Sequence, residues 1–176
     1  MESNKRQKTK RIIEKAMVEL LKHESFDQIT TVKLTQTAKI SRSSFYTHYR
    51  DKYDMIEQYQ DKVFHQLEYV FGKYWKDKHQ AIIEVFTFLS QEDLLAALLT
   101  ENGTKEIQTF LRHKLQVMLS EDLYQRFDHK KLSPIETEYS HVYLTNAVFG
   151  VCQMWIARGK KENPTQIADF LMKMLG

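Results

Sequence analysis

The sequence contains few residues that interrupt a helix and almost no thiol chemistry. Its 176 residues include only five glycines and two prolines, which favours a mostly helical chain. Cys152 is the only cysteine, so neither a disulfide nor a cysteine-rich metal site can form within one chain. No stretch approaches the ~18 uncharged apolar residues that a membrane span requires, and the basic, polar N-terminus is not typical of a secretory signal. We therefore expect an all-α protein in the cytoplasm, with no membrane partner.

Charged residues are unevenly distributed along the chain. Residues 1–52 contain twelve Lys and Arg but six Asp and Glu, which gives a formal charge of +6, whereas the remainder carries −3. A basic segment of this kind indicates that one end of the protein binds a polyanion, although a solvated basic face has the same composition. Either a frayed tail or an arm on a nucleic-acid backbone fits the basic run at its start, which consists of Lys5, Arg6, Lys8, Lys10 and Arg11.

The first third of the chain has the pattern of one long helix followed by two short ones. The long helix is predicted over residues 5–22, with an apolar stripe of Ile12, Ile13, Ala16, Met17, Leu20 and Leu21. Thr30 or Thr31 can cap a short second helix, and Ser41 can cap a short third one. Two helices this short cannot bury a core alone, so they must pack on the first helix. Their packing residues are Leu34, Ala38, Ile40, Phe45 and Tyr49.

Stop and start signals divide the rest of the chain into further helices. Asn102-Gly103 is the clearest internal stop. Ser133-Pro134 followed by Glu136 predicts the start of a long helix, and Asn163-Pro164 repeats the signal for a last one. No flexible linker separates the parts. We therefore expect a three-helix helix-turn-helix domain over residues 1–52 and a helical regulatory and dimerisation domain over 53–176, joined by a fourth helix.

The third helix presents a polar side opposite its packing residues. A helix in the DNA major groove needs such a surface of small or hydrogen-bonding side chains, here Arg42, Ser43, Ser44, Tyr46 and Thr47. Groups that suit phosphate surround it, namely Thr31, His48, Arg50 and Lys52. Two alternatives stay open, because Tyr46 could be a packing tyrosine and His48 an ordinary surface histidine.

An ordered pattern runs through about residues 8–60 and consists of Arg11-Ile12-Ile13, Ala16, Leu20-Leu21, Phe26, Ile29-Thr30, Leu34, Ala38, Ile40-Ser41-Arg42, Phe45-Tyr46, His48-Tyr49 and Asp51-Lys52. This pattern resembles the TetR/AcrR family of transcriptional regulators. The resemblance implies two sets of DNA contacts, bases for Arg42, Ser43 and Thr47, and phosphates for Thr31, Tyr46, His48 and Lys52.

Two positions depart from the family pattern. Lys39 stands in the turn where the family often has glycine, and Ser43 replaces a frequent glycine on the third helix. A lysine can adopt a left-handed turn only with some backbone strain. Neither change removes a group that would contact DNA, so DNA binding is still expected.

A second resemblance covers residues 135–175 and is carried by Phe149-Gly150, Trp155, Gly159, Pro164 and Ile167-Ala168. It is to the C-terminal domain of the subgroup that includes regulators of dihydroxyacetone kinase operons. Some members of that subgroup work through a partner protein. The alternative function is therefore a helical co-activator or protein-interaction subunit with weak or no operator binding.

The last two helices, at about 134–158 and 164–175, are the expected homodimer contact, because Gly150 is unfavourable inside a helix unless another helix packs closely on it. Aromatic residues of the bundle are mostly core by their type, but some could line a pocket for a small-molecule effector. The candidates are the aromatic residues Phe86, Phe110 and Tyr143, with His113 and Asn146 as polar groups.

No catalytic constellation is present. Glu138 and His141 have the spacing of a di-iron ligand pair, but the chain has no second such pair, so we expect neither a metal nor another cofactor. Cys152, in an apolar stretch, is expected to be a core or interface residue. The sequence thus predicts a dimeric repressor that binds a palindromic operator in double-stranded DNA and is released by a small-molecule effector or a protein partner.

Overall fold

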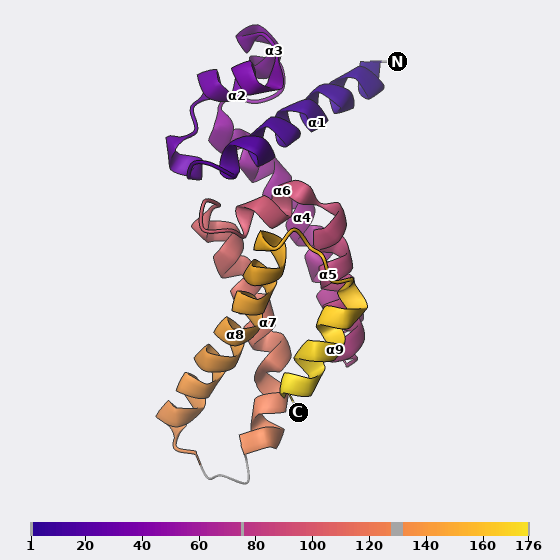
Figure 1. The fold of residues 1–176 in the computed structure, drawn as a ribbon, viewed down its shortest axis with the longest axis vertical. Helices are drawn as coiled ribbons and strands as arrows, with labels where there is room; N and C mark the ends of the chain where they lie inside the picture. Colours follow the sequence, from indigo (N-terminus) through magenta and orange to yellow (C-terminus); the bar gives the residue numbers. More distant parts are fainter. Residues whose placement is uncertain (1, 75, 128–131, 176) are drawn as a thin grey trace. The chain divides into compact units, whose positions relative to one another are not determined.

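The computed structural model describes residues 2–74, 76–127 and 132–175, and every regular element within them is helical (Figure 1). In chain order these are α1 (Glu2–Leu21), the 3-10 helix η1 (Phe26–Gln28), α2 (Thr31–Ala38), α3 (Arg42–Tyr46), α4 (Lys52–Lys73), α5 (Lys78–Gln91), α6 (Asp93–Leu98), α7 (Lys105–Phe127), α8 (Pro134–Ala157) and α9 (Pro164–Leu175). The expected all-α fold is confirmed. None of the described helices is long and apolar enough to cross a membrane.

The chain divides into two compact units that are not continuous in sequence. The first contains residues 1–66 and 92–104, and the second contains 67–91 and 105–176. α4 therefore contributes to both units, and α6 belongs to the first, where it packs on α1. The DNA-binding domain expected from the sequence ended at residue 52. The first unit also contains the start of α4 and α6, and no local pattern in the sequence shows that this short apolar helix returns to α1.

Asn102 connects the loop after α6 to the end of α1. Its carbonyl accepts a hydrogen bond from the Phe26 N–H at 2.8 Å, and its Nδ2 donates to the Leu21 carbonyl at 2.8 Å. The next residue has no room for a side chain, because a Cβ on Gly103 would lie 1.8 Å from the carbonyl oxygen of Leu98. The predicted stop signal is thus a turn that also joins two distant segments.

Tyr59 of α4 is a second connection within the first unit. Its hydroxyl donates to Oε2 of Glu92 at 3.1 Å and accepts the N–H of Leu95 at 3.0 Å, at the start of α6. Burial, followed by the nearby Glu92 carboxylate, raises the pKa of Tyr59. The phenol therefore keeps its proton and the connection to α6 persists at neutral pH.

In the second unit α7 packs along α8, and α5 packs along α9 (Figure 1). The ring of Phe86 meets that of Trp155 edge to face, with the centroids 5.0 Å apart. Trp155 Nε1 donates to the Glu162 carbonyl at 2.8 Å, and His79 Nε2 lies 2.8 Å from Oδ1 of Asp169. These contacts fix the loop before α9 and join α9 to α5.

The predicted start signals of the last two helices are confirmed. Ser133 and Glu136 form a capping box, in which the Glu136 carboxylate accepts the Ser133 N–H at 2.8 Å. Asn163 and Gln166 exchange backbone-to-side-chain hydrogen bonds of 2.9 Å at the start of α9. α8 ends at Ala157 with Arg158 as its C-cap, and Gly159 follows with φ +81°.

Cys152 is buried in α8, with 3% of its surface exposed. Burial raises the pKa of its thiol to about 12. Because the thiolate is the reactive form of cysteine, a thiol with this pKa is unreactive at neutral pH. The prediction that Cys152 is a core residue is confirmed.

Candidate nucleic-acid interface

The helix-turn-helix is built from local caps and a shared apolar interior. The hydroxyl of Thr30 accepts the N–H of Lys33 at 3.2 Å and begins α2, and the hydroxyl of Ser41 accepts the N–H of Ser44 at 3.1 Å and begins α3. Phe45 is fully buried. The remaining packing residues predicted from the sequence are also buried or half-buried, namely Leu34, Ala38, Ile40 and Tyr49. One side of α3 is thereby fixed against the rest of the unit.

Lys39 forms the turn between α2 and α3 in the left-handed conformation, with φ 54° and ψ 43°. Its N–H donates to the carbonyls of Thr35 and Gln36, and the N–H of Ile40 also reaches Thr35 at 3.1 Å. A residue with a Cβ is strained here by about 1–2 kcal/mol, as the replacement of the family's glycine predicted. The surrounding hydrogen bonds hold the turn in this geometry nevertheless.

The opposite side of α3 is exposed and polar. Arg42, Ser43, Tyr46 and Thr47 are all exposed, and Tyr46 retains 56% of its surface. Tyr46 stands with its ring edge-on to buried Phe45, at 5.6 Å between centroids. The tyrosine therefore packs on Phe45 and leaves more than half of its surface in solvent. Tyr46 thus has both the ring contact expected of a packing tyrosine and the exposed surface expected of a DNA contact.

Ser44 differs from its neighbours on α3 because it is half-buried and used locally. Its N–H is the donor to the Ser41 cap, and its carbonyl accepts the hydroxyl of Thr47 at 2.7 Å. The hydroxyl of Ser43 lies 2.9 Å from that of Ser41. Ser43 and Thr47 are thus pre-positioned by bonds within the helix, and Ser44 contributes mainly to its start.

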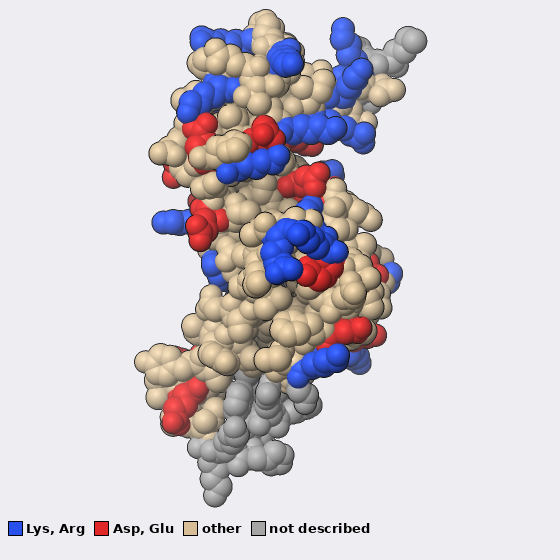
Figure 2. All heavy atoms as spheres, in the orientation of Figure 1, with Lys and Arg blue, Asp and Glu red and all other residues tan. Residues whose placement is uncertain are grey.

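Basic residues of α1 lie close to His48, which the sequence pattern did not predict. His48 is half-buried, and its Nδ1 has no hydrogen-bond partner among the described residues. Burial, and then the charges of Arg6 and Lys10, lower the pKa of His48. On the face that Figure 2 shows, mainly Lys and Arg side chains lie around α3 and the first turns of α1. The imidazole is therefore neutral at neutral pH and lies near two cationic side chains.

Lys10 is held in place instead of extending freely into solvent. Its ammonium donates to Oε1 of Gln58 at 3.0 Å and lies 5.0 Å from the ring centroid of Tyr49. The basic run at the start of the chain is helical, as part of α1. Only the spacing of Arg6 and Lys10, four residues apart on one helix face, could have indicated that they act together.

The position of Lys52 contradicts the prediction that its side chain contacts a phosphate. Only 7% of its surface is exposed, and its Nζ donates to the carbonyls of Phe26 and Asp27 at 2.7 and 2.9 Å. The ammonium also lies 4.7 Å from the ring centroid of Phe26 and 5.0 Å from that of Tyr53. Two N–H groups of the ammonium are thus used by backbone carbonyls, and two aromatic rings lie beside it. Lys52 therefore supports the fold and is not placed to bind phosphate.

The other predicted phosphate ligands are at the surface. Thr31 is the first residue of α2 and half-buried, and Thr30 supplies the cap instead. The side chain of Arg50 is 82% exposed and lies 3.5 Å from Oδ1 of Asp54. The N–H groups in the first turn of α2 give Thr31 the electropositive surroundings that favour a phosphate.

The five residues expected to line an effector pocket are not brought together. Phe86 packs on Trp155 in the core, whereas His113, Tyr143 and Asn146 are exposed. Phe110 is half-buried on α7. None of the five lines the pocket described below. Residue type could not show which side of α7 or α8 faces inward, and Tyr143 and Asn146 lie on the outer side of α8.

A short turn that holds an exposed polar α3, beside basic residues of α1, has the geometry of a helix-turn-helix module. Residues 76–176, more than half of the chain, match the TetR_C_8 family model, described as the C-terminal region of a transcriptional regulator. The chain belongs to this family of TetR-type transcriptional regulators.

Individual proteins are similar to this chain in sequence or in fold. The HTH-type transcriptional regulator YxbF of Bacillus subtilis (strain 168) is 22% identical, over 93% of this chain and 43% of YxbF. This chain therefore spans less than half the length of that relative. The solved TetR regulator from Streptococcus agalactiae 2603V is similar in fold, with a TM-score of 0.59, 22% identity and coverage of 99% and 97%. The dihydroxyacetone kinase operon activator DhaS has a TM-score of 0.55 at 18% identity, with 95% and 93% covered.

Proposed function

We propose that this chain binds a palindromic operator as a homodimer and represses transcription until a small-molecule effector releases it. The observation that supports this most directly is the exposed polar side of α3, fixed by buried Phe45 on its other side. The function is one of binding and not of catalysis. It places the protein in the cytoplasm, where the operator is.

In this proposal α3 enters the major groove. Arg42, Ser43 and Thr47 read base edges, because they are exposed and end in hydrogen-bonding groups. Tyr46 and Thr31 bind flanking phosphates. His48 completes a phosphate site together with Arg6 and Lys10, whose charges add to the effect of burial in lowering the pKa of His48.

Dimerisation through α8 and α9 is supported by their outer surfaces. Tyr139, Tyr143 and Met154 of α8 are exposed by 60% or more, as is Met174 of α9, and Phe170 is exposed by 46%. Exposed apolar side chains that lie together are typical of a protein–protein interface. A Cβ on Gly150, on the same outer side of α8, would meet no atom within 4 Å. Its surface is therefore open to a closely packed helix of a second copy.

Such a dimer would place two α3 helices in successive major grooves, roughly 34 Å apart. An effector that binds better to a different spacing of the α3 helices would weaken operator binding by its differential affinity for the two states. Repression follows from steric exclusion of polymerase by a dimer that covers a promoter.

Selection of binding sites from a random DNA duplex pool tests the proposal. The native chain is compared with an Arg42→Ala/Tyr46→Ala variant, which changes only exposed side chains of α3 and should fold normally, as circular dichroism would verify. Enrichment of a palindrome by the native chain alone is the expected result. A folded dimer that enriches nothing and shows no salt-dependent DNA binding would overturn it in favour of a protein-interaction subunit.

A further inference from the structure

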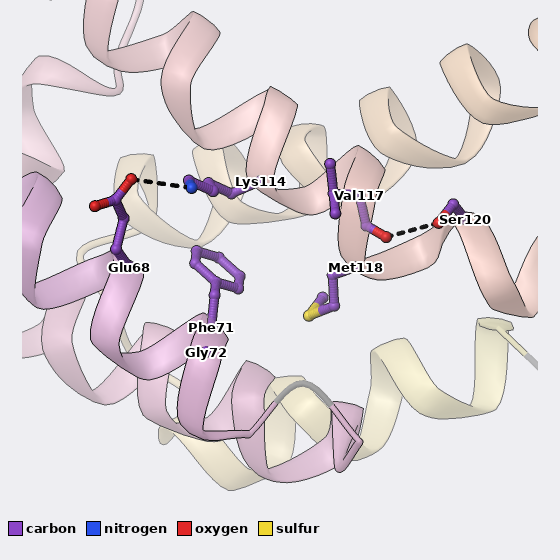
Figure 3. A pocket seen from close by; sticks show the side chains of 7 residues that line it. All are labelled: Glu68, Phe71, Gly72, Lys114, Val117, Met118 and Ser120. Carbon is purple, nitrogen blue, oxygen red and sulfur yellow. Dashed lines mark hydrogen bonds and ion pairs between the residues drawn. The ribbon is translucent and has the colours of Figure 1, made fainter.

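A cavity of about 350 Å³ lies in the second unit between the last turns of α4 and the middle of α7 (Figure 3). It is lined by Glu68, Phe71 and Gly72 from α4 and by Lys114, Val117, Met118 and Ser120 from α7. This volume falls within the range of small-molecule sites in proteins. The sequence did not predict the cavity, because none of the residues singled out for effector binding lies in its wall.

The lining is apolar except at one end. Figure 3 shows the ring of Phe71 and the side chain of Met118 directed into the space between the helices, with Val117 beside them. The hydroxyl of Ser120 is already used, since it donates to the carbonyl of Val117 at 2.7 Å. The polar end is formed by the ion pair of Glu68 and Lys114, whose Oε1 and Nζ atoms are 3.1 Å apart.

Gly72 leaves the wall of this cavity open. It lies inside α4, where glycine is the poorest helix former apart from proline. No close packing requires it, because a Cβ built on Gly72 would meet no atom within 4 Å. A larger residue would favour the helix and would extend toward the cavity. The glycine is therefore unfavourable for α4, and it leaves the space beside it unfilled.

The ion pair indicates the charge of the ligand. The side chain of Glu68 is 53% exposed, whereas that of Lys114 is 27% exposed, and the ammonium also lies 5.4 Å from the ring centroid of Phe110. A ligand carboxylate could replace Glu68 on Lys114 and let Glu68 return to water at little cost. A cationic ligand would have to take Glu68 and leave the less exposed Lys114 without its counter-ion, which is less favourable.

We propose that this cavity binds an amphipathic monocarboxylate, with its carboxylate on Lys114 and its apolar tail against Phe71, Val117 and Met118. The proposal that a ligand binds here depends only on the cavity and its lining residues. The role of this ligand as the effector rests on the proposed function.

Calorimetric titration of the full chain with decanoate, below its micelle concentration, tests the site. Decanol and decylamine serve as neutral and cationic controls of equal length, and both should bind at least about tenfold more weakly. Shortening the acid to octanoate and hexanoate should weaken binding about fourfold for each methylene removed. Equal affinity for decanoate and decanol would overturn the assignment of the carboxylate to Lys114.

Two variants of the ion pair should change the affinity in opposite directions. Lys114→Gln should weaken decanoate binding about tenfold or more, and Glu68→Gln should tighten it by removing the competing carboxylate. Variants that weaken binding equally would show that the pair acts only structurally, which overturns the proposed headgroup site.

Gly72→Leu should fill the cavity without lowering thermal stability, because the added Cβ meets open space and the helix gains a better former. Loss of decanoate binding in this folded variant is expected, and unchanged affinity would overturn the site. Decanoate should release operator from the native chain but not from Gly72→Leu. Calorimetric binding without release would overturn the effector role alone. Absence of operator binding would overturn the proposed function and leave the calorimetric result standing.

Discussion

The ammonium group of Lys52 lies 2.7 Å from the carbonyl oxygen of Phe26, and this hydrogen bond joins the start of α4 to η1. The two residues are far apart in sequence, and the bond is buried. A lysine that the sequence pattern places among phosphate ligands is thus part of the support beneath the helix-turn-helix.

Lys52→Met should lower the free energy of unfolding by about 1–3 kcal/mol, because it removes the hydrogen bonds of the ammonium to the Phe26 and Asp27 carbonyls, and the Phe26 carbonyl keeps only the N–H of Ile29. The matched control is Lys33→Met, which removes a half-exposed ion pair to Glu24 and should change stability by less than about 1 kcal/mol. Urea unfolding measures both. If Lys52 were a phosphate ligand, its loss would instead reduce the salt slope of operator binding by about one with stability unchanged.

Arg42→Ala should reduce discrimination at one operator position by about 1–3 kcal/mol, because an exposed guanidinium on α3 is suited to a bidentate contact with a base. Arg6→Ala should weaken binding to all sequences alike and lower the salt slope by about one. Anisotropy titrations with the operator and single-base variants separate these results. A uniform loss for Arg42→Ala would reject its role as a base reader.

Operator affinity should rise as the pH falls below about 6.5, by up to about tenfold per pH unit. In the free protein, burial and the charges of Arg6 and Lys10 lower the pKa of His48 from 6.5. A phosphate would raise that pKa, so binding takes up a proton, and the effect ends below the pKa of the free protein. His48→Gln should flatten the dependence, and an unchanged dependence in this variant would exclude His48 as its source.

The stability of the free protein should show the opposite dependence on pH. The folded-state pKa of His48 lies below the unfolded value of 6.5, so its effect on stability is absent above 6.5 and becomes unfavourable as the pH falls through the folded-state pKa. Without DNA, the urea midpoint should therefore decrease as the pH is lowered across this range. His48→Gln should reduce that decrease, and an equal decrease in both proteins would assign it to other groups.

Gly150→Leu should weaken the dimer by about tenfold or more without unfolding the protomer. Within one chain the added side chain meets open space and improves the helix, whereas a closely packed partner helix would be overpacked. Analytical ultracentrifugation measures the dissociation constant. Gly150→Ala is the graded control and should have a smaller effect. A dimer that is unaffected by leucine would place the interface elsewhere.

Features that depend on neighbours in sequence could be predicted from it. The Ser133 and Glu136 capping box, the Ser41 cap and the buried side of α3 each involve residues within a few positions, so their pattern determines their structure. Once Phe45 is known to be buried, the residues on the opposite side of α3 can be predicted to be exposed.

Features that depend on distant contacts could not be predicted. The position of Lys52 is determined by the Phe26 carbonyl, and the surroundings of His48 by α1. Phe86 and Tyr143 are both aromatic residues in amphipathic or apolar helices, yet one is buried and the other is 71% exposed. Their sequence pattern does not contain that difference, because it arises from which helices pack together.

The hydrogen bonds of Asn102 have a consequence for how this protein folds. They connect the end of α1 to the loop after α6 across most of the first unit's length in sequence. The first unit is therefore complete only after residue 104 has left the ribosome, and its formation depends on loop closure over a long intervening segment. A fragment truncated after α4 would lack α6 and expose the apolar surface of α1 that α6 covers. Such a fragment is expected to aggregate and not to bind DNA by itself.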